Sequence, residues 1–265
     1  MSEWNPTQYL KFENERTQPS IDLVTRIDID SAQKIIDIGC GPGNSTRILA
    51  ERFPNAYILG IDKSSDMIET AKKNYPNLDF KICDVSTDLS IIDNDFDIIF
   101  SNACIQWIPN HNQLLRNMIK LLKTGGVLAV QTPMNYQSPI HQIIREISTN
   151  EKWKPKFGNP RIFYNLTQNE YFDLLSEISA NFSMWETTYY HRLTSHMDIL
   201  EWYRGTGLRP YLNALSDELK KAFEQDIFNR VIKEYPLQRN GNIIFRFPRL
   251  FFIATAQERP KESNY

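Results

Sequence analysis

The sequence predicts an α/β fold in which helices cover both faces of a mainly parallel sheet. Short apolar runs alternate with helical segments through the first half of the chain, as they do where helices join parallel strands. A glycine cluster directly follows the first apolar run, where a strand would turn into a helix. The 265 residues, 41% of them hydrophobic, are enough for one core domain with a smaller second lobe.

The elements of the first half follow in a regular order. Apolar runs predict strands at residues 34–38, 57–62, 78–83, 96–101 and 127–131. Helical spacing predicts helices at residues 44–53, 64–75 and 114–122. Ser64 is the expected N-cap of the second helix, and the glycines at 125 and 126 are expected to end the third.

The second half has a different character. Residues 153–160 are rich in Lys, Pro and Gly and predict a loop, followed by a helix at 168–178 and a strand at 184–193. Two or three helices are expected at 196–233, and then a late strand at 243–256. Pro248 within that strand suggests a bend or an edge position. We expect four segments: an N-terminal segment (1–30), a core (31–194), a helical cap (195–240), and the last strand with a polar tail (241–265).

Composition excludes several classes of protein. Thirty basic against thirty-two acidic residues give a net charge of −2, unlike the basic excess of a nucleic-acid binder. The richest apolar run, residues 250–256, is far shorter than a membrane span, and the first residues do not resemble a signal peptide. Three widely spaced cysteines indicate reduced thiols. The four histidines are scattered, and His191 and His196, five residues apart, span an expected strand–helix junction, so we expect no metal site. We expect a cytoplasmic protein, monomeric or weakly dimeric.

Charge is unevenly distributed along the chain. Residues 1–190 hold 18 basic and 23 acidic side chains, whereas residues 191–249 hold 10 basic and 7 acidic ones. The second stretch places four arginines among aromatic residues: Arg204, Arg209, Arg246 and Arg249. They are either solvated surface charges or a basic pocket for a small anion, because arginine beside aromatic rings suits a planar carboxylate.

The glycine cluster has the spacing G-x-G-x-G, with Gly39, Gly41 and Gly43 at the expected strand-to-helix turn. The dinucleotide fingerprint G-x-G-x-x-G would have its third glycine where Asn44 stands. Asp37, inside the end of the strand, suits a cationic amino group and would repel a pyrophosphate. The alternative role for Asp37 is to order the loop by accepting hydrogen bonds.

Two further carboxylates follow the next two strands. Asp62 ends the second strand, from which an acidic side chain can accept hydrogen bonds from ribose hydroxyls. Asp84, after the third strand, could accept from an adenine amino group, with Met67 and Val85 as apolar walls. Met67 is equally explained by ordinary helix packing.

These residues, together with residues 96–107, resemble the class I S-adenosylmethionine-dependent methyltransferases. The resemblance implies a Rossmann-like sheet of seven strands, the last antiparallel, with the cap inserted between the last two. It also implies S-adenosyl-L-methionine as cofactor, with the glycine loop around its methionine part, Asp62 at the ribose and Asp84 near the adenine. The residues expected to bind the cofactor are Tyr9, Arg16, Asp37, Gly39, Cys40, Gly41, Asn44, Asp62, Lys63, Met67, Asp84, Val85 and Asn102.

Tyr9 and Arg16 belong to an aromatic-rich segment, residues 4–16, that precedes the first strand. The resemblance implies that this segment folds over the cofactor, with both side chains near its carboxylate. The alternative is a helix that packs on the sheet edge.

Further segments resemble one branch of that family, whose members esterify a small tricarboxylic acid. They are residues 4–6, 9–10, 15–16, 102–103, 106–107, 187–191, 206–210, 235–238 and 247–251. Such an acceptor is already ionised at neutral pH, since a carboxyl group has a pKa of about 4. Transfer therefore needs alignment and desolvation of the reactants and no general base.

The resemblance and the charge distribution together suggest the acceptor contacts. Gln106 and Trp107 are expected to position the reacting groups, although core packing is an alternative for Trp107. The residues expected to bind the polycarboxylate are Trp107, Tyr189, Tyr190, His191, Arg209, Arg246 and Arg249. Surface charge is the alternative for Arg246 and Arg249.

Three other functions compete with this interpretation. A carboxyl methyltransferase for a fatty or carrier-bound acid would need fewer arginines and a longer apolar channel. A nicotinamide-dependent oxidoreductase is disfavoured by the missing third glycine and by Asp37. A cofactor-binding protein without catalysis would keep the same glycine loop.

Overall fold

The computed structural model describes residues 13–87, 92–157 and 163–257. Within these residues the strands form one seven-stranded sheet with the order β3-β2-β1-β4-β5-β7-β6. The chain divides into two compact units. The core unit comprises residues 16–132, 164–186 and 250–265, and the helical unit comprises residues 1–15, 133–163 and 187–249.

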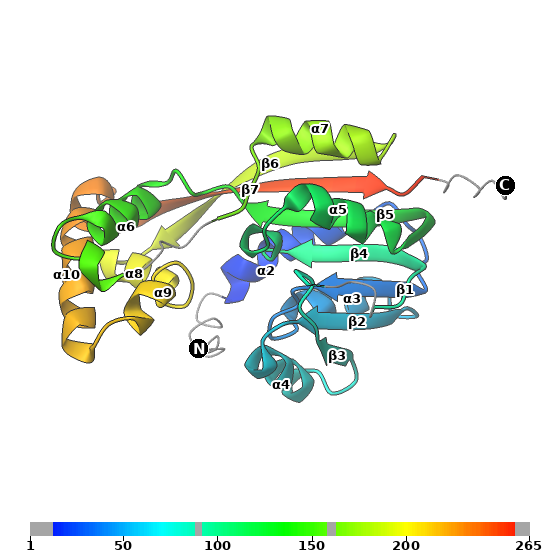
Figure 1. The fold of residues 1–265 in the computed structure, drawn as a ribbon, viewed down its shortest axis with the longest axis horizontal. Helices are drawn as coiled ribbons and strands as arrows, with labels where there is room; N and C mark the ends of the chain where they lie inside the picture. The colour runs from blue at the N-terminus through cyan, green and yellow to red at the C-terminus, as the bar shows by residue number, and fades with distance from the viewer. Residues whose placement is uncertain (1–12, 88–91, 158–162, 258–265) are drawn as a thin grey trace. The chain divides into compact units, whose positions relative to one another are not determined.

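Four parallel strands form the first part of the sheet in the core unit (Figure 1). They are β1 (Lys34–Ile38), β2 (Tyr57–Asp62), β3 (Asp79–Ile82) and β4 (Phe96–Asn102). In β1, Ile36 pairs with Leu59 on one side and with Ile99 on the other. Because β1 and β4 lie inside the sheet, nearly every residue of both is buried.

Helices α3 (Asn44–Arg52) and α4 (Ser65–Asn74) join strands β1 to β3, and α5 (His111–Lys120) follows β4. The core unit also contains α2 (Glu13–Val24), which precedes β1, and α7 (Gln168–Ile178), which comes later in the chain. Ser64 caps α4, its hydroxyl accepting from the Met67 amide. Helix α4 packs against β3 and β2, and α5 packs against α7. The alternation of strand and helix predicted for the first half is confirmed.

The remaining strands are β5 (Leu122–Pro133), β6 (Phe182–Leu193) and β7 (Ile243–Thr255). The Gly125 amide donates to the Ala256 carbonyl, and the Met134 amide donates to the Pro248 carbonyl. Residue numbers therefore rise along β5 as they fall along β7, so the predicted antiparallel last strand is confirmed. The edge position suggested by Pro248 is wrong, because β7 lies between β5 and β6.

The helix expected at 114–122 is shifted in the structure. Helix α5 already begins at His111, because the Asn110 side chain accepts from the Gln113 amide and caps it. It ends at Lys120, and β5 takes in the two glycines that were expected to end the helix. A Cβ at Gly126 would lie 2.8 Å from the Phe96 carbonyl oxygen, at an irregularity in the β4–β5 pairing. Gly126 thus permits close contact between strands.

The helical unit contains α6 (Pro139–Thr149), α8 (His196–Arg204), α9 (Arg209–Asn213) and α10 (Asp217–Glu234). Helices α8, α9 and α10 lie between β6 and β7 in the sequence, as predicted for the insertion. Helix α10 packs against α6 and α8. Helix α6 was not predicted, although isoleucines at 140, 143, 144 and 147 give it a buried face. None of the described helices combines the length and apolarity that crossing a membrane requires.

Candidate functional site

The glycine loop joins β1 to α3 with backbone conformations that favour glycine. Gly39, Gly41 and Gly43 have φ values of 76°, 54° and 95°. The amides of Gly39 and Cys40 both donate to the Ile61 carbonyl, which holds the loop against the end of β2. A Cβ at Gly39 would lie only 2.3 Å from Cys104 Sγ. The first glycine is therefore required both by its conformation and by the close approach of the turn after β4.

Asp37 is fully buried beneath this loop. Its Oδ2 accepts hydrogen bonds from the hydroxyls of Ser45 (2.6 Å) and Thr46 (2.7 Å). Among the described residues, nothing donates to its Oδ1. Burial raises the pKa of Asp37 to about 6, against the opposing effect of the two hydroxyls. A buried carboxylate with one oxygen available is suited to receive a cationic amino group.

Asp62 connects the loop to the beginning of α4. Its Oδ2 accepts from the Gly41 amide (3.1 Å), and its Oδ1 accepts from the Ser64 amide (2.9 Å). Burial raises its pKa, and the backbone donors partly oppose this shift. Each carboxylate oxygen retains a further lone pair that can accept from a ligand hydroxyl. Of the neighbouring predicted contacts, Met67 is buried on α4 and Lys63 is exposed.

Asp84 lies half-buried in the turn that follows β3, with Val85 beside it. Its Oδ1 accepts from the Ser86 amide (3.0 Å) and from the Ser86 hydroxyl (2.6 Å). Burial disfavours the charged form, but the Ser86 hydrogen bonds outweigh it and leave the pKa of Asp84 below its usual value. The third carboxylate is therefore ionised and partly engaged in ordering its own turn.

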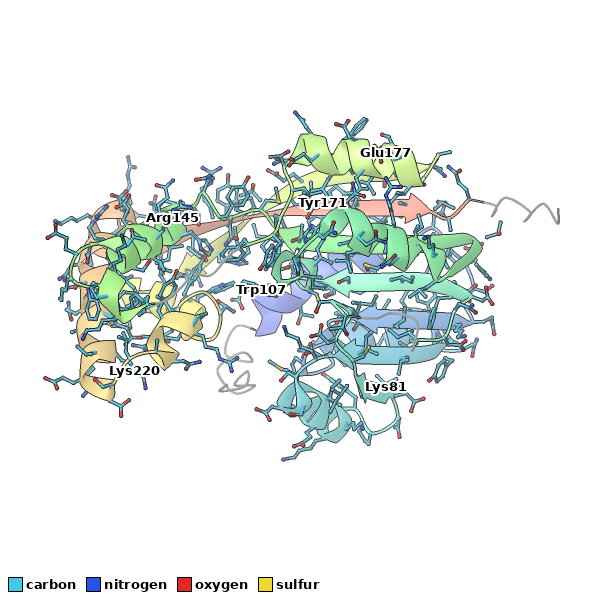
Figure 2. The ribbon with its side chains drawn as sticks, in the orientation of Figure 1. Lys81, Trp107, Arg145, Tyr171, Glu177 and Lys220 are labelled. Atoms are coloured by element: carbon cyan, nitrogen blue, oxygen red, sulfur yellow. The ribbon has the colours of Figure 1, made fainter. Side chains whose placement is uncertain are left out.

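The turn after β4 contains Asn102 and the residues predicted to position the reactants. Gln106 is buried, and its Nε2 donates to the Ala103 carbonyl (2.6 Å). Ala103 itself has a φ of 53°. Trp107 ends the short 3-10 helix η1 (Ile105–Trp107) and is half-buried (Figure 2). The Gln106 side chain thus stabilises the turn that presents Trp107.

His111 also holds this turn, a role that the sequence did not suggest. It is 1% exposed, its Nε2 lies 2.8 Å from the Ile105 carbonyl, and its Nδ1 lies 2.6 Å from the Tyr171 hydroxyl. Because only a protonated Nε2 can donate to the carbonyl, Nδ1 is the acceptor for Tyr171 in the neutral ring. Burial lowers the pKa of His111. No spacing in the sequence relates His111 to Tyr171, which lies sixty residues later on α7.

In the helical unit, the predicted acceptor residues separate onto two strand faces. Arg249 is buried, and its guanidinium carbon lies 5.9 Å from the ring centre of Tyr189, which stacks on His191. Arg246 lies on the opposite, exposed face of β7, over the ring of Tyr190. The alternation of strand side chains produces this separation.

The four arginines differ in burial and in their contacts. Arg204 is paired with Glu224 through two hydrogen bonds, of 2.6 and 3.0 Å. Arg209 is half-buried and is the first residue of α9. The surface-charge interpretation thus fits Arg246 in the structure, whereas Arg249 is 3% exposed.

A buried polar group in the helical unit was missed by sequence reasoning. The Tyr203 hydroxyl lies 3.0 Å from Asn135 Nδ2 and 3.1 Å from His141 Nε2. Tyr203 lies within the helical region that the sequence predicts at 196–233, whereas Asn135 and His141 lie where the sequence predicts no element. The isoleucine spacing of α6 could have placed His141 on a helix, but nothing in the sequence indicates its contact with Tyr203.

Two predicted cofactor residues cannot be placed. Tyr9 lies outside the described residues, as does most of the 4–16 segment. Arg16 belongs to α2, but its side chain is also outside the description.

Comparison with known proteins identifies the class to which this loop and sheet belong. Residues 29–207 match the family model described as a methyltransferase domain. The YcgJ protein from Bacillus subtilis has a similar fold, with a TM-score of 0.59 and 17% identity, covering 91% of this chain and 100% of that one. Phosphoethanolamine N-methyltransferase 2 from Haemonchus contortus, solved with S-adenosyl-L-methionine, has a TM-score of 0.52 at 17% identity over 91% of this chain and 53% of that one. The protein is a methyltransferase.

A relative with higher sequence identity shows which family of methyltransferases the chain belongs to. The trans-aconitate 2-methyltransferase of Enterobacter sp. (strain 638) is 39% identical over 254 residues, covering 96% of this chain and 98% of the relative. This chain belongs to the trans-aconitate 2-methyltransferase family. The branch suggested by the segments at 187–191, 206–210, 235–238 and 247–251 is thereby confirmed.

Proposed function

We propose that this enzyme transfers a methyl group from S-adenosyl-L-methionine to one carboxylate of trans-aconitate and forms its monomethyl ester. The observation that carries the proposal is Asp37, a buried carboxylate under the glycine loop with one oxygen to which no described residue donates. The α-amino group of the cofactor is a cation of the kind that such a site favours. Trans-aconitate is the proposed acceptor because a relative that matches nearly the whole chain is a trans-aconitate 2-methyltransferase.

The loop and the next two strand ends offer complementary contacts for the cofactor. We assign Asp37, Gly39, Cys40, Gly41 and Asn44 to the methionine part. Asp62 would accept from the ribose hydroxyls, since each of its oxygens has one backbone donor and a lone pair to spare. The remaining cofactor contacts in this proposal are Lys63, Met67, Asp84, Val85 and Asn102, with Tyr9 and Arg16 at the carboxylate.

The chemistry of the transfer requires little from acid–base groups. When bound, S-adenosyl-L-methionine supplies a methyl group made electrophilic by a sulfonium ion. An ionised acceptor oxygen would form the new O–C bond as the C–S bond breaks, and the electron pair of the C–S bond would stay on sulfur. No proton moves, so no general base is needed.

Two histidines, His111 in the core unit and His191 in the helical unit, fit this mechanism. Both ring nitrogens of His111 are engaged in hydrogen bonds. His191 is neutral at pH 7, because burial and the charge of Arg249 lower its pKa to about 4. The protein would act by holding and desolvating the reactants, an effect that can supply several kcal/mol. Trp107, presented by the turn that Gln106 stabilises, is the proposed positioning group.

In this proposal Arg209, from the helices at 195–240, contacts a carboxylate of the acceptor. Removing one partner of a buried charge pair costs roughly 2–5 kcal/mol, or about 30-fold to several-thousand-fold in affinity. Arg209→Ala should therefore raise KM for trans-aconitate strongly. Unchanged KM and kcat would remove Arg209 from the proposal.

Methyl transfer from labelled S-adenosyl-L-methionine to a panel of acids tests the function itself. The panel contains trans-aconitate, cis-aconitate, citrate and a medium-chain fatty acid. We expect clear preference for trans-aconitate. Preference for the fatty acid would support the proposed cofactor but show that the proposed acceptor is wrong. Binding of the cofactor without transfer to any acid would show that the proposed reaction is wrong.

A further inference from the structure

Arg249 places a fixed positive charge in the interior of the helical unit. Its side chain is 3% exposed, and its guanidinium carbon lies 4.5 Å from the ring centre of Phe247 and 5.9 Å from that of Tyr189. A guanidinium keeps its charge in proteins, and its planar donors match a carboxylate. The aromatic rings beside it exclude water, which strengthens any interaction with an anion.

His191 adds a hydrogen-bonding group without adding a second charge. It stacks on Tyr189 with 6.1 Å between ring centres, and burial together with the Arg249 charge lowers its pKa to about 4. Its Nε2 is buried, and no described residue forms a hydrogen bond with it. A buried ring nitrogen of this kind can be satisfied by a ligand.

Tyr203 adds a hydroxyl that two neighbouring side chains hold in place. Asn135 Nδ2 donates to its oxygen at 3.0 Å, and His141 Nε2 lies 3.1 Å from the same oxygen. Burial raises the pKa of Tyr203 far above its ordinary value, so the hydroxyl keeps its proton at neutral pH. Where His141 carries its proton on Nε2 and donates, the hydroxyl proton of Tyr203 is available for an anion.

These six side chains come from four parts of the helical unit. Asn135 and His141 come from α6 and the turn before it, Tyr189 and His191 from β6, Tyr203 from α8, and Arg249 from β7. The hydrogen bond from the Met134 amide to the Pro248 carbonyl (2.9 Å) brings the first and last of these segments together. Arg249 is the member of this group that carries a permanent charge, and its planar donors suit an anionic carboxylate.

We propose that Arg249 and Tyr203, supported by Asn135, His141, Tyr189 and His191, bind an acceptor carboxylate that is not methylated. This inference rests on the proposed function and specifies how the enzyme distinguishes a tricarboxylate from a dicarboxylate. Arg246, on the exposed face of β7, has no part in it.

Selectivity between acids tests the proposal, because a purely structural role would not change it. Itaconate, mesaconate and glutaconate each lack a different carboxylate of trans-aconitate. The experiment measures kcat/KM for trans-aconitate and for each dicarboxylate with wild-type enzyme, Arg249→Lys and Tyr203→Phe. Arg192→Lys, on the exposed side of β6, and Tyr211→Phe, a buried tyrosine packed on Phe157 and Phe223, are the matched controls.

We expect wild-type enzyme to prefer trans-aconitate strongly over at least one dicarboxylate. Arg249→Lys and Tyr203→Phe should lower that preference by about tenfold or more, since each loses a hydrogen bond to a charged group. The controls should keep it. Titration of tricarballylate into enzyme saturated with S-adenosylhomocysteine should show the same loss of affinity in the two test variants.

The possible failures are distinguishable. If wild-type enzyme transfers no methyl group to trans-aconitate, the proposed function is wrong and this inference falls with it. If wild-type enzyme is active and Tyr203→Phe keeps the same preference and tricarballylate affinity, only this inference is wrong. Tyr203→Phe removes a single oxygen, so it decides the matter even where Arg249→Lys fails to fold.

Discussion

His111 and Tyr171 are joined by a hydrogen bond of 2.6 Å between the ring nitrogen Nδ1 and the phenolic oxygen. The other ring nitrogen of His111 holds the Ile105 carbonyl at the beginning of the turn that carries Gln106 and Trp107. Tyr171 on α7 thereby fixes, through one buried imidazole, the backbone after β4. The proposed positioning group at Trp107 depends on this support.

Tyr171→Phe should therefore destabilise the fold. It removes the donor to His111 Nδ1 and leaves a buried acceptor unsatisfied, which costs about 1–3 kcal/mol in the free energy of unfolding. Urea denaturation measures this change. Tyr57→Phe, at a side chain 49% exposed, should stay within about 0.5 kcal/mol of wild type. Equal effects of the two substitutions would show that the His111–Tyr171 bond contributes nothing.

Asp37→Asn should weaken S-adenosyl-L-methionine binding by about 30-fold or more, because the neutral amide cannot pair with the cofactor's amino group. Titration calorimetry measures the affinity, with Asp79→Asn on the exposed beginning of β3 as the control. The pKa of Asp37 is about 6 in the free protein. Affinity of the wild type should therefore fall as pH decreases through about 6, and Asp37→Asn should lack this dependence. A wild-type affinity that stays flat across that range would contradict the assignment.

Gly39→Ala should disrupt the loop far more than the same change at Gly125. Both glycines have nearly equal φ values, 76° and 77°, but a Cβ at Gly125 would meet nothing within 4 Å. We expect Gly125→Ala to cost about 1–2 kcal/mol of stability from its left-handed backbone alone. Gly39→Ala adds the clash with Cys104, and Cys104→Gly should recover part of the loss in the double variant. Similar losses at the two glycines would mean that Cys104 moves aside freely.

His191 should make the fold less stable in acid. Its pKa falls from 6.5 to about 4 on folding, so the unfolded chain binds a proton that the folded chain refuses between these values. The contribution of His191 to the free energy of unfolding therefore has its full value above pH 6.5. It decreases by on the order of 2–3 kcal/mol as the pH falls toward 4. Urea unfolding of wild type and His191→Gln from pH 7 to 4.5 isolates it. A stability difference that does not change with pH would refute the shift.

The core of the fold was predictable because each strand and helix is locally encoded. The apolar run at 34–38 followed by glycines defines β1 and its loop, and Asp37 and Asp62 follow from strand ends that meet at one edge. The pairing of strands that are far apart in the sequence was harder to predict. Nothing near Pro248 indicates that β6 forms on the far side of β7, so an edge position was the natural but wrong expectation.

The sequence indicated which types of residue would bind the acceptor, but it did not show which of them lie close together. Aromatic rings and arginines in the second half indicated an anion, yet the sequence could not show that Glu224 pairs with Arg204. Strand alternation separates Arg246 from Arg249, but only the buried packing of β7 against its neighbours shows which face lies inside. Tyr203, His141 and Asn135 meet through tertiary contacts alone.

The most direct test of the central claim identifies the product of one reaction. Enzyme, trans-aconitate and S-adenosyl-L-methionine carrying a carbon-13 methyl group are combined, and the product is examined by NMR and mass spectrometry. The account predicts one labelled methyl ester per trans-aconitate, with S-adenosylhomocysteine in equal amount. A labelled methyl group on any atom other than a carboxylate oxygen, or no labelled product from folded, cofactor-bound enzyme, would contradict it.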